Sequence, residues 1–329
     1  MSKKIYDIAI IGGGPVGIFT AYYAAMRTVN PILIESMPKL GGQPANLYAQ
    51  KQIYDIAGQF GISGRELIDN LLQTKGHFHY NTKLQTTVTN IQKVPNTDYF
   101  SLETNGENIW AKSVIIAIGN GPFEPRKLAV KYDPQLEKNQ LAYFVKDLNT
   151  YKDQDVLIAG GGDTAIDWAL AINKIAHKTF LLHRRDTFRA LESSITSLQK
   201  SDIEVLTPNI ITDVQEINAD SIQVTFQTVK SKDIKQITVN KLLVNYGIKT
   251  DSRLLRGWQL DLKGPFIKVD SQMRTNRPLI YAVGDVVYYP GKKRLIALGF
   301  AEGPIAVNTA IAELYPDKTK FGHSSSLFN

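Results

Sequence analysis

Two short glycine clusters have the spacing that binds a dinucleotide. The first comprises Gly12, Gly14 and Gly17, in the order G-x-G-x-x-G. In this motif the first glycine permits a tight turn, the second lets the backbone approach a pyrophosphate, and the third lets a helix pack closely on a strand. The second cluster, with Gly160, Gly162 and Ala165, repeats the pattern with alanine in the third position. The chain therefore has two candidate pyrophosphate sites.

Charged residues that follow each cluster predict which adenosine each turn holds. Glu35 lies about 20 residues beyond the first cluster, where a carboxylate binds the two hydroxyls of an unphosphorylated ribose and repels a phosphate. The corresponding place after the second cluster holds Arg184 and Arg185, with Arg189 one turn further on. Guanidiniums are fork-shaped donors suited to a phosphate dianion, so the second site is predicted to bind NADP rather than NAD. His183, beside them, either adds a hydrogen bond or packs.

A further polar residue follows a buried strand near the end of the chain. The strand predicted over Leu279–Val283 runs directly into Gly284 and Asp285. An aspartate in this position can hydrogen-bond a polyol while its backbone N–H approaches a phosphate. Gly284 and Asp285 are therefore candidate ligands of a nucleotide cofactor.

Strand and helix patterns supply the elements that these residues need. Ile8–Ile11 and Asp155–Ala159 are apolar runs typical of strands buried on both faces of a parallel sheet, and each precedes a glycine cluster. Good helix formers follow each cluster, so each helix directs its N-terminus and positive dipole end at the phosphates. Further strands are expected over Ser221–Val229 and Ile237–Val244. The predicted fold class is α/β with two Rossmann-like dinucleotide-binding domains.

The order of the motifs predicts that one domain is inserted into the other. Residues 1–119 form the first part of the domain that holds the unphosphorylated adenosine, and residues 120–247 form the NADPH-binding domain. Residues 248–329 then return to the first domain, because Asp285 supplies a polar group suited to the same cofactor.

Composition narrows the classes of function. The chain has 329 residues, of which 43% are hydrophobic and none is cysteine. Disulfides, thiolate nucleophiles, cysteine-ligated clusters and dithiol relays are therefore excluded. No metal site is expected, because His77 and His79 lack an evident third ligand. Asp7 interrupts the apolar start and no cleavage site follows, so we expect a cytoplasmic protein without a signal peptide and without a membrane span.

The basic charge of the chain has two open interpretations. The net charge is +7 and the pI is about 9.2, with lysines and arginines spread along the sequence. No nucleic-acid motif is present, so no nucleic-acid partner is expected. The basic residues either form an ordinary solvated surface or form a docking surface for an acidic protein.

These motifs resemble those of two-dinucleotide-domain flavoprotein reductases. The matching stretches are GGGPVG at 12–17, GGQ at 41–43, GGGDTA at 160–165, HRRDTFRA at 183–190 and YAVGDV at 281–286. The layout is similar to that of thioredoxin reductases, but these need a C-x-x-C pair that this chain lacks. The closer resemblance is to the thioredoxin-reductase-like ferredoxin–NADP reductases, which lack the dithiol. The stretches NLYAQKQIYD, GNGPFEPRKL and the C-terminal HSSSLF carry that resemblance.

The resemblance implies roles for individual residues. Tyr48 is expected to stack on one face of the isoalloxazine and His323 to cover the other, and no acid–base residue is expected. The residues implied for FAD are Gly12, Gly14, Pro15, Val16, Gly17, Glu35, Gly42, Gln43, Tyr48, Val88, Phe123, Gly284, Asp285, Ser324 and Ser325. Those implied for NADP are Gly160, Gly162, Asp163, Thr164, Ala165, His183, Arg184, Arg185 and Arg189. The family forms homodimers, and the C-terminal tail covers either its own flavin or that of the partner subunit.

The resemblance also implies an activity. The chain would be an FAD-dependent oxidoreductase that moves electrons between NADPH and ferredoxin or flavodoxin, by hydride transfer to the flavin and one-electron release. An alternative is an NADPH-dependent reductase of free flavin, quinone or ferric chelates, and a third is a flavin redox sensor. Because ferredoxins and flavodoxins are acidic, basic residues are candidates for docking them. These candidates are Arg126, Lys127, Lys292, Lys293 and Arg294.

Overall fold

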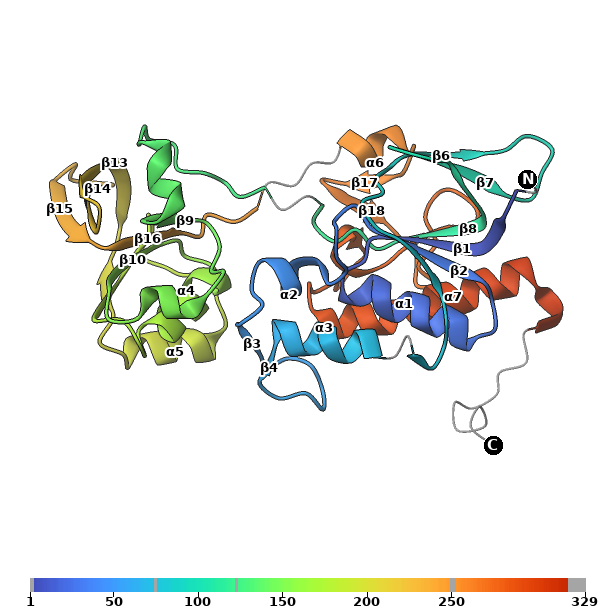
Figure 1. The fold of residues 1–329 in the computed structure, drawn as a ribbon, viewed down its shortest axis with the longest axis horizontal. Coiled ribbons are helices and arrows are strands. Elements are labelled where there is room, and N and C mark those ends of the chain that lie inside the picture. The colour runs from blue at the N-terminus through green and yellow to red at the C-terminus, as the bar shows by residue number, and fades with distance from the viewer. Residues whose placement is uncertain (1–2, 74–75, 122–123, 249–252, 319–329) are drawn as a thin grey trace. The chain divides into compact units, whose positions relative to one another are not determined.

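The computed structural model describes residues 3–73, 76–121, 124–248 and 253–318 (Figure 1). The chain divides into two compact units. The first comprises Met1–Asn46, Gln52–Pro122 and Thr250–Asn329, and the second comprises Leu47–Lys51 and Phe123–Lys249. The domain boundaries after residues 119 and 247 stay a prediction, and the sequence did not predict that Leu47–Lys51 belongs to the second unit.

A seven-stranded sheet forms the centre of the first unit. Its order is β5-β2-β1-β8-β7-β6, and β19 also pairs with β8. The strands β5, β2, β1, β8 and β19 are parallel, whereas β6 and β7 are antiparallel additions. The bounds are β1 (Ile5–Ile11), β2 (Pro31–Ile34), β5 (Asn81–Lys83), β6 (Val88–Lys93), β7 (Phe100–Thr104), β8 (Ile109–Ile116) and β19 (Ile280–Ala282).

Alternate residues of these strands face two different cores. Ile8 and Ile10 pack with the apolar faces of α1 (Pro15–Met26), α3 (Gly64–Gln73) and α7 (Ile296–Leu314). Their neighbours Ala9 and Ile11 face the other core, which β6 and β7 share. The shorter elements are α2 (Gly42–Asn46), β3 (Gln52–Ile53), β4 (Ile62–Ser63), α6 (Arg253–Gly257), β17 (Leu262–Lys263), β18 (Phe266–Lys268), β20 (Val287–Tyr288) and the 3₁₀ turns η4 (Gly284–Val286) and η5 (Pro316–Lys318).

Two glycines of α7 set how closely α1 packs against it. A Cβ on Gly303 would lie 2.5 Å from the hydroxyl oxygen of Thr20, and one on Gly299 would overlap the side chain of Val16. Because Thr20 is fully buried and donates its hydroxyl to the Val16 carbonyl at 2.7 Å, it has little room to move. The two helices therefore require glycine at both positions.

We expect Gly303→Ala to lower the free energy of unfolding by about 1–3 kcal/mol, because overpacking a tight core costs that much. The better helix propensity of alanine offsets only about 1 kcal/mol of this cost. Urea unfolding followed by circular dichroism measures the change, with Ala301→Ser on the exposed face of the same helix as the control. A Gly303→Ala protein as stable as the wild type would show that α1 and α7 are not packed as described.

The second unit has three layers. A parallel sheet of order β12-β11-β10-β16-β9 carries helices on one face and an antiparallel sheet of order β13-β14-β15 on the other (Figure 1). Its parallel strands are β9 (Leu141–Ala142), β10 (Asp155–Ala159), β11 (Lys178–Leu182), β12 (Glu204–Leu206) and β16 (Lys241–Val244). The other elements are α4 (Asp163–Ile172), α5 (Glu192–Gln199), β13 (Asn209–Asn218), β14 (Ser221–Thr228), β15 (Ile234–Val239), and the turns η2 (Pro134–Lys138) and η3 (Leu148–Tyr151).

One predicted strand of this unit is wrong. The apolar run Ile237–Val244 was expected as a single strand, but it divides at Asn240 into β15 and β16, which belong to different sheets. The side chain of Asn240 accepts the N–H of Asp155 at 2.8 Å and donates to the carbonyl of Asp220 at 2.9 Å, which fixes the break. Over the described ranges, no helix of either unit is long and apolar enough to cross a membrane.

Candidate functional site

The first glycine cluster forms a tight turn between β1 and α1, at the carboxyl edge of the sheet. Gly12 has a φ of +108°, and a Cβ there would lie 2.5 Å from the carbonyl oxygen of Ala117. A Cβ on Gly17 would overlap the carbonyl oxygen of Gly12. Pro15 occupies the first turn of α1, where its missing N–H costs nothing. The turn thus brings the N-terminus of α1 against the end of β1, as a pyrophosphate site requires.

Glu35 directs its carboxylate at this turn. The side chain is buried, and Oε2 accepts the N–H of Gly13 at 2.6 Å. Oε1 accepts the N–H of Met37 at 2.7 Å and the hydroxyl of Ser36 at 3.1 Å. These donors fix the carboxylate beside the turn, in the position from which an acidic residue binds ribose hydroxyls.

Two distant segments complete the surroundings of the first turn. The N–H of Gly41 donates to the carbonyl of Gly13 at 2.8 Å, and a Cβ on Gly42 would lie 2.8 Å from the Cα of Gly14. The start of α2, with Gln43, therefore lies against the turn. On another side, a Cβ on Gly284 would contact the side chain of Val16 at 3.6 Å.

Asp285 directly follows Gly284 and provides a carboxylate next to the first glycine turn. Its Oδ2 accepts the amide of Asn120 at 3.4 Å. Burial raises the pKa of Asp285, whereas Lys292 and Arg294 nearby oppose that rise and Glu302 adds to it. The structure thus brings together residues from five stretches that are far apart in sequence, beginning at 12, 35, 41, 120 and 284.

Glu302 is a buried residue of this region that sequence reasoning missed. The residue is 2% exposed, and its carboxylate accepts the N–H of Gly284 and the hydroxyl of Tyr289, each at 2.7 Å. It also pairs with the ammonium of Lys292 at 2.5 Å. The available signal was a lone charged residue in the largely apolar stretch GFAEGPIAVNTA of the predicted helix.

The same ion pair corrects one docking prediction. The side chain of Lys292 is 5% exposed, because its ammonium is buried against Glu302. Lys292 therefore cannot meet a partner protein at the surface, and its assignment as a docking residue is wrong.

The remaining residues predicted for FAD are placed as follows. Val88 is buried at the start of β6, close to Glu35, whose carbonyl accepts the N–H of Thr86 at 2.9 Å. Tyr48 belongs to the second unit, where its ring packs against the core that includes α4. Lys51, beside it, forms an ion pair with Asp167 at 2.6 Å in the same unit. The other predicted residues, Phe123, His323, Ser324 and Ser325, lie outside the described residues.

The second glycine cluster repeats the geometry of the first between β10 and α4. A Cβ on Gly160 would lie 2.6 Å from the carbonyl oxygen of Asn245, and Gly162 is the N-cap of α4. The segment after β11 folds over this turn, since the N–H of Arg189 donates to the carbonyl of Gly161 at 2.8 Å. Asp163, in the first turn of α4, accepts the N–H of Leu191 at 3.0 Å. Ala165 is fully buried, and Thr164 lies exposed at the start of the helix.

His183 packs rather than projecting a free imidazole. Its ring stacks on Phe188 with 5.6 Å between centroids, and a Cβ on Gly161 would overlap it. Burial lowers the pKa of His183, and the guanidiniums of Arg184, Arg185 and Arg189 lower it further. The imidazole is therefore neutral at neutral pH and adds no charge of its own. Packing is the interpretation that the structure supports.

Three guanidiniums lie near enough to His183 to lower its pKa. Arg184, Arg185 and Arg189 are exposed, and within the described part of the chain no carboxylate forms an ion pair with them. Three neighbouring like charges without a counter-ion repel one another, so a bound phosphate dianion would relieve this repulsion.

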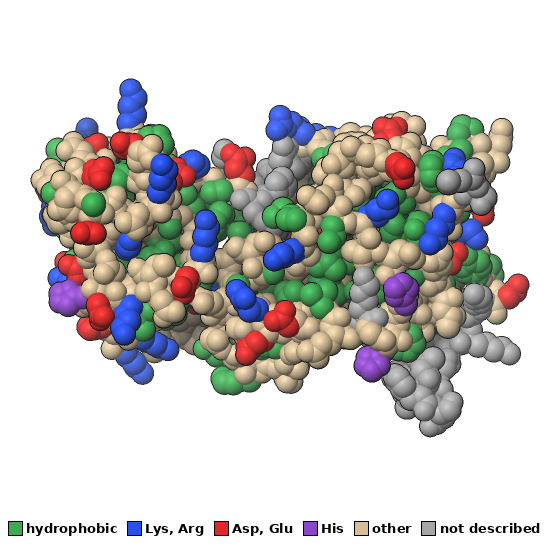
Figure 2. All heavy atoms as spheres, in the orientation of Figure 1, with side chains coloured by type: hydrophobic (Ala, Val, Ile, Leu, Met, Phe, Trp, Pro, Cys, Tyr) green, Lys and Arg blue, Asp and Glu red, His purple; other side chains and the backbone are tan. Residues whose placement is uncertain are grey.

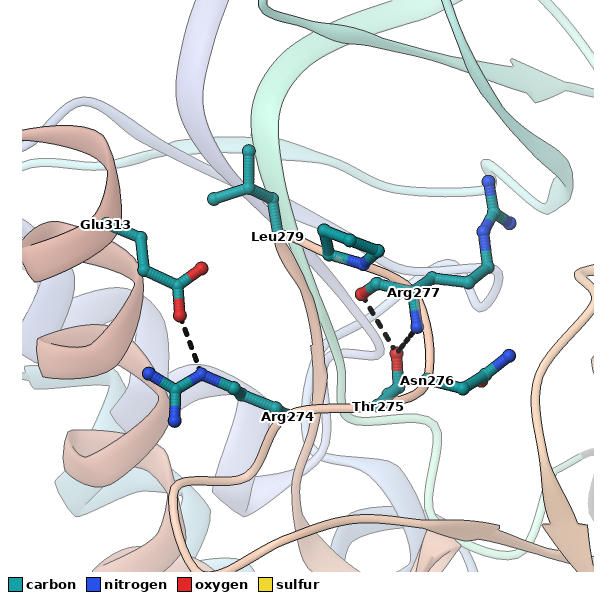
Figure 3. A pocket seen from close by; sticks show the side chains of 7 residues that line it. Arg274, Thr275, Asn276, Arg277, Leu279 and Glu313 are labelled. Atoms are coloured by element: carbon teal, nitrogen blue, oxygen red, sulfur yellow. Dashed lines mark hydrogen bonds and ion pairs between the residues drawn. The ribbon is translucent and has the colours of Figure 1, made fainter.

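A pocket elsewhere in the first unit does not suit a dinucleotide (Figure 3). It is lined by Glu313 and by residues 274–279, which precede β19 and so lie at the amino end of the parallel strands. Its arginines are already engaged, since Arg274 pairs with Glu313 at 2.7 Å and Arg277 donates to two backbone carbonyls. Ligands of such sheets bind at the carboxyl ends of the strands, where both glycine turns lie.

Comparison with known proteins places this geometry in one family. Residues 6–313 match the family described as pyridine nucleotide-disulphide oxidoreductase. The chain is 47% identical over 325 residues to ferredoxin–NADP reductase 2 of Latilactobacillus sakei, covering 99% of this chain and 98% of the relative. It is 44% identical over 331 residues to a ferredoxin–NADP reductase of Halalkalibacterium halodurans, covering both chains completely.

Solved structures show the same fold. The crystal structure of Lactococcus lactis thioredoxin reductase aligns with a TM-score of 0.80 and 27% identity, covering 93% of this chain and 97% of that one. The thioredoxin reductase of T. acidophilum aligns with a TM-score of 0.83 at 21% identity, covering 95% and 99% of the two chains. The predicted fold class, α/β with two Rossmann-like sheets, is confirmed.

Proposed function

The chain belongs to the pyridine nucleotide-disulphide oxidoreductase family, and on that premise we propose that it transfers electrons between NADPH and ferredoxin through bound FAD. The observation that carries this proposal is the contrast between two equivalent positions. Glu35 follows the first glycine turn, whereas Arg184 and Arg185 follow the second, in a chain without cysteine. Two different adenosines are held, and no dithiol is present to receive the electrons. The relatives named ferredoxin–NADP reductase support ferredoxin as the carrier.

The residues around the first turn fit FAD. The glycine turn, where a Cβ would clash, would hold the pyrophosphate, and the carboxylate of Glu35 would bind the hydroxyls of the adenosine ribose. Asp285 is the acceptor for the polyol chain, and Gly42 and Gln43 border the turn. FAD supplies the chemistry of accepting a hydride and releasing single electrons, so the chain needs neither a nucleophile nor a metal. The protein contributes binding, orientation and charge.

The second turn binds the nucleotide that exchanges. The N-terminus of α4 and the backbone at Gly162 face the pyrophosphate, while Arg184 and Arg185 bind the 2′-phosphate. His183 supports this site by packing on Phe188. We therefore assign residues 120–247 to NADPH, and residues 1–119 with 248–329 to FAD.

Several finer features belong to the same proposal. Flavodoxin is a second acidic carrier of suitable chemistry, and the protein acts as a cytoplasmic homodimer. Resemblance to the reductase family supports these features. Tyr48 is the proposed stacking residue on one flavin face.

Reduction by NADPH tests the proposed function directly. We expect the purified protein to contain FAD, identified after denaturation, and expect NADPH to bleach the flavin absorbance under anaerobic conditions. Ferredoxin added next should restore the absorbance, with about two ferredoxins per FAD, because a hydride carries two electrons. Slow bleaching without any fast acceptor would instead favour a redox sensor.

We expect added salt to slow the reduction of ferredoxin, because opposite charges on the two proteins accelerate their encounter. Arg126, Lys127, Lys293 and Arg294 are the remaining docking candidates, although Lys127 also pairs with Glu137 at 2.8 Å. Lysines and arginines are dispersed among acidic residues on the face shown in Figure 2. The measurement is the ferredoxin reduction rate against ionic strength, with a neutral quinone as the control acceptor. A rate independent of salt would contradict electrostatic docking.

A further inference from the structure

A buried polar network lies directly beneath the Gly284–Asp285 turn. Its centre is Glu302 of α7, whose two carboxylate oxygens receive three donors: the N–H of Gly284, the hydroxyl of Tyr289 and the ammonium of Lys292. The side chains of Glu302 and Lys292 are 3% and 5% exposed. All three donors are close to Asp285 in sequence, between Gly284 and Lys292. One carboxylate therefore holds this whole segment in place.

Folding alone gives a weak reason to bury this ion pair. Desolvating two opposite charges costs several kcal/mol, and apolar residues of similar volume often replace a buried pair without loss of stability. A role in the site above them is a second reason for a fold to retain these charges. Lys292 is the strongest of the charges that favour ionised Asp285 against the effect of burial, with Arg294 second. Glu302 opposes them, and the amide of Asn120 donates to Asp285 directly.

A second carboxylate on the same helix offers a contrast. Glu313 also accepts a tyrosine hydroxyl, from Tyr281 at 2.7 Å, and pairs with Arg274 (Figure 3). The side chain of Glu313 is 31% exposed and lies at the amino end of β19, away from the glycine turn. Of these two pairs in the described residues, the pair of Glu302 and Lys292 is the one that contacts a residue assigned to the cofactor.

We propose that Glu302 and Lys292 are positioning residues of the flavin site. Glu302 fixes the turn through the N–H of Gly284, and Lys292 supplies the positive charge beside the carboxylate of Asp285. Both statements rest on the proposed function, because they take the ligand of Asp285 to be FAD.

The two charges should affect bound FAD in opposite directions. Glu302→Gln leaves the ammonium of Lys292 buried without its partner, and extra positive charge favours the electron-rich reduced flavin. Lys292→Met leaves the carboxylate of Glu302 unpaired, and extra negative charge disfavours that form. A purely structural role would not produce opposite shifts from the two ends of one ion pair.

The experiment compares Glu302→Gln, Lys292→Met and the double variant with the wild type. We expect Glu302→Gln to raise the Kd for FAD by about tenfold or more, because the neutral amide is a weaker acceptor for the N–H of Gly284 than the carboxylate is. The midpoint potential of bound FAD should rise in Glu302→Gln, fall in Lys292→Met and return towards the wild-type value in the double variant. Reconstitution of the apoprotein monitored by flavin fluorescence gives the Kd, and anaerobic dye equilibration gives the potential.

Matched controls separate this role from general damage. Glu313→Gln removes the contrasting carboxylate of α7, and Lys263→Met removes an exposed positive charge of the same unit. Both should leave the Kd for FAD and the potential unchanged. If Glu302→Gln alone does not fold, Lys292→Met and the double variant still decide the sign of the shift.

The outcomes are distinct. Wild-type FAD binding with unchanged Kd and potential in the variants would overturn this inference alone, as would shifts of the same sign in both single variants. A wild-type protein that binds no FAD would overturn the proposed function together with this inference.

Discussion

Replacing Gly17 with alanine is expected to abolish FAD binding and to prevent the first unit from folding. The new Cβ would overlap the carbonyl oxygen of Gly12. The backbone fixes the positions of both atoms, and the turn holds that backbone in place. No rotamer change can relieve the clash, so α1 would have to move away from β1. Overpacking in cores usually costs about 1–3 kcal/mol, and a clash between backbone atoms belongs at or above the upper end of that range. Soluble yield, bound flavin absorbance and urea unfolding measure the loss.

The matched control is a glycine of the same unit with space around it. No heavy atom outside the local helix lies within 4 Å of a Cβ built on Gly257, at the end of α6, so Gly257→Ala should bind FAD normally. If Gly17→Ala bound FAD with wild-type affinity, the assignment of this turn to the pyrophosphate would be wrong.

The double substitution Arg184→Ala with Arg185→Ala is expected to lower kcat/KM for NADPH by about a hundredfold or more. Each guanidinium contributes charge-assisted hydrogen bonds to the 2′-phosphate, worth about 1.5–3 kcal/mol, and tenfold in affinity corresponds to about 1.4 kcal/mol. NADH lacks this phosphate, so its kcat/KM should change little. The measurement is steady-state kinetics with both nucleotides, and the expected signature is a collapse of the preference for NADPH.

Two controls accompany this substitution. Lys200→Ala removes an exposed positive charge of the same unit beyond α5, and it should leave the nucleotide preference intact. Binding of 2′,5′-ADP should weaken in the double variant, whereas binding of 5′-AMP should not. Equal losses with NADPH and NADH would contradict the phosphate site.

The sequence predicts well those parts of the fold that are encoded locally. The strand, glycine turn and helix around Gly12 form one contiguous unit, so an apolar run and three glycines suffice to identify it. The carboxylate of Glu35 lies at the turn because the spacing from Gly12 is set by one helix and one strand. Glu35 and Arg184 follow their glycine turns at closely similar spacings, so the difference in charge between the two positions is informative.

Contacts between distant segments could not be predicted in this way. Glu302 appears in the sequence only as a carboxylate in a largely apolar helix, and its partner Gly284 is revealed only when α7 packs beside the end of β19. Lys292 looked like a surface lysine, because sequence pattern does not show that an ammonium is buried. The prediction of one strand over Ile237–Val244 was wrong for a related reason. A nearly continuous apolar run does not show that the chain passes from one sheet to another.

The central claim is that the electrons of NADPH pass through FAD to a small protein carrier. The measurement that tests it most directly compares kcat/KM of the FAD-loaded wild type with NADPH toward ferredoxin, flavodoxin, a quinone and free flavin, side by side. We predict the highest value for ferredoxin, with flavodoxin next. A quinone or free flavin reduced as efficiently as ferredoxin would contradict the claim and favour a general flavin or quinone reductase.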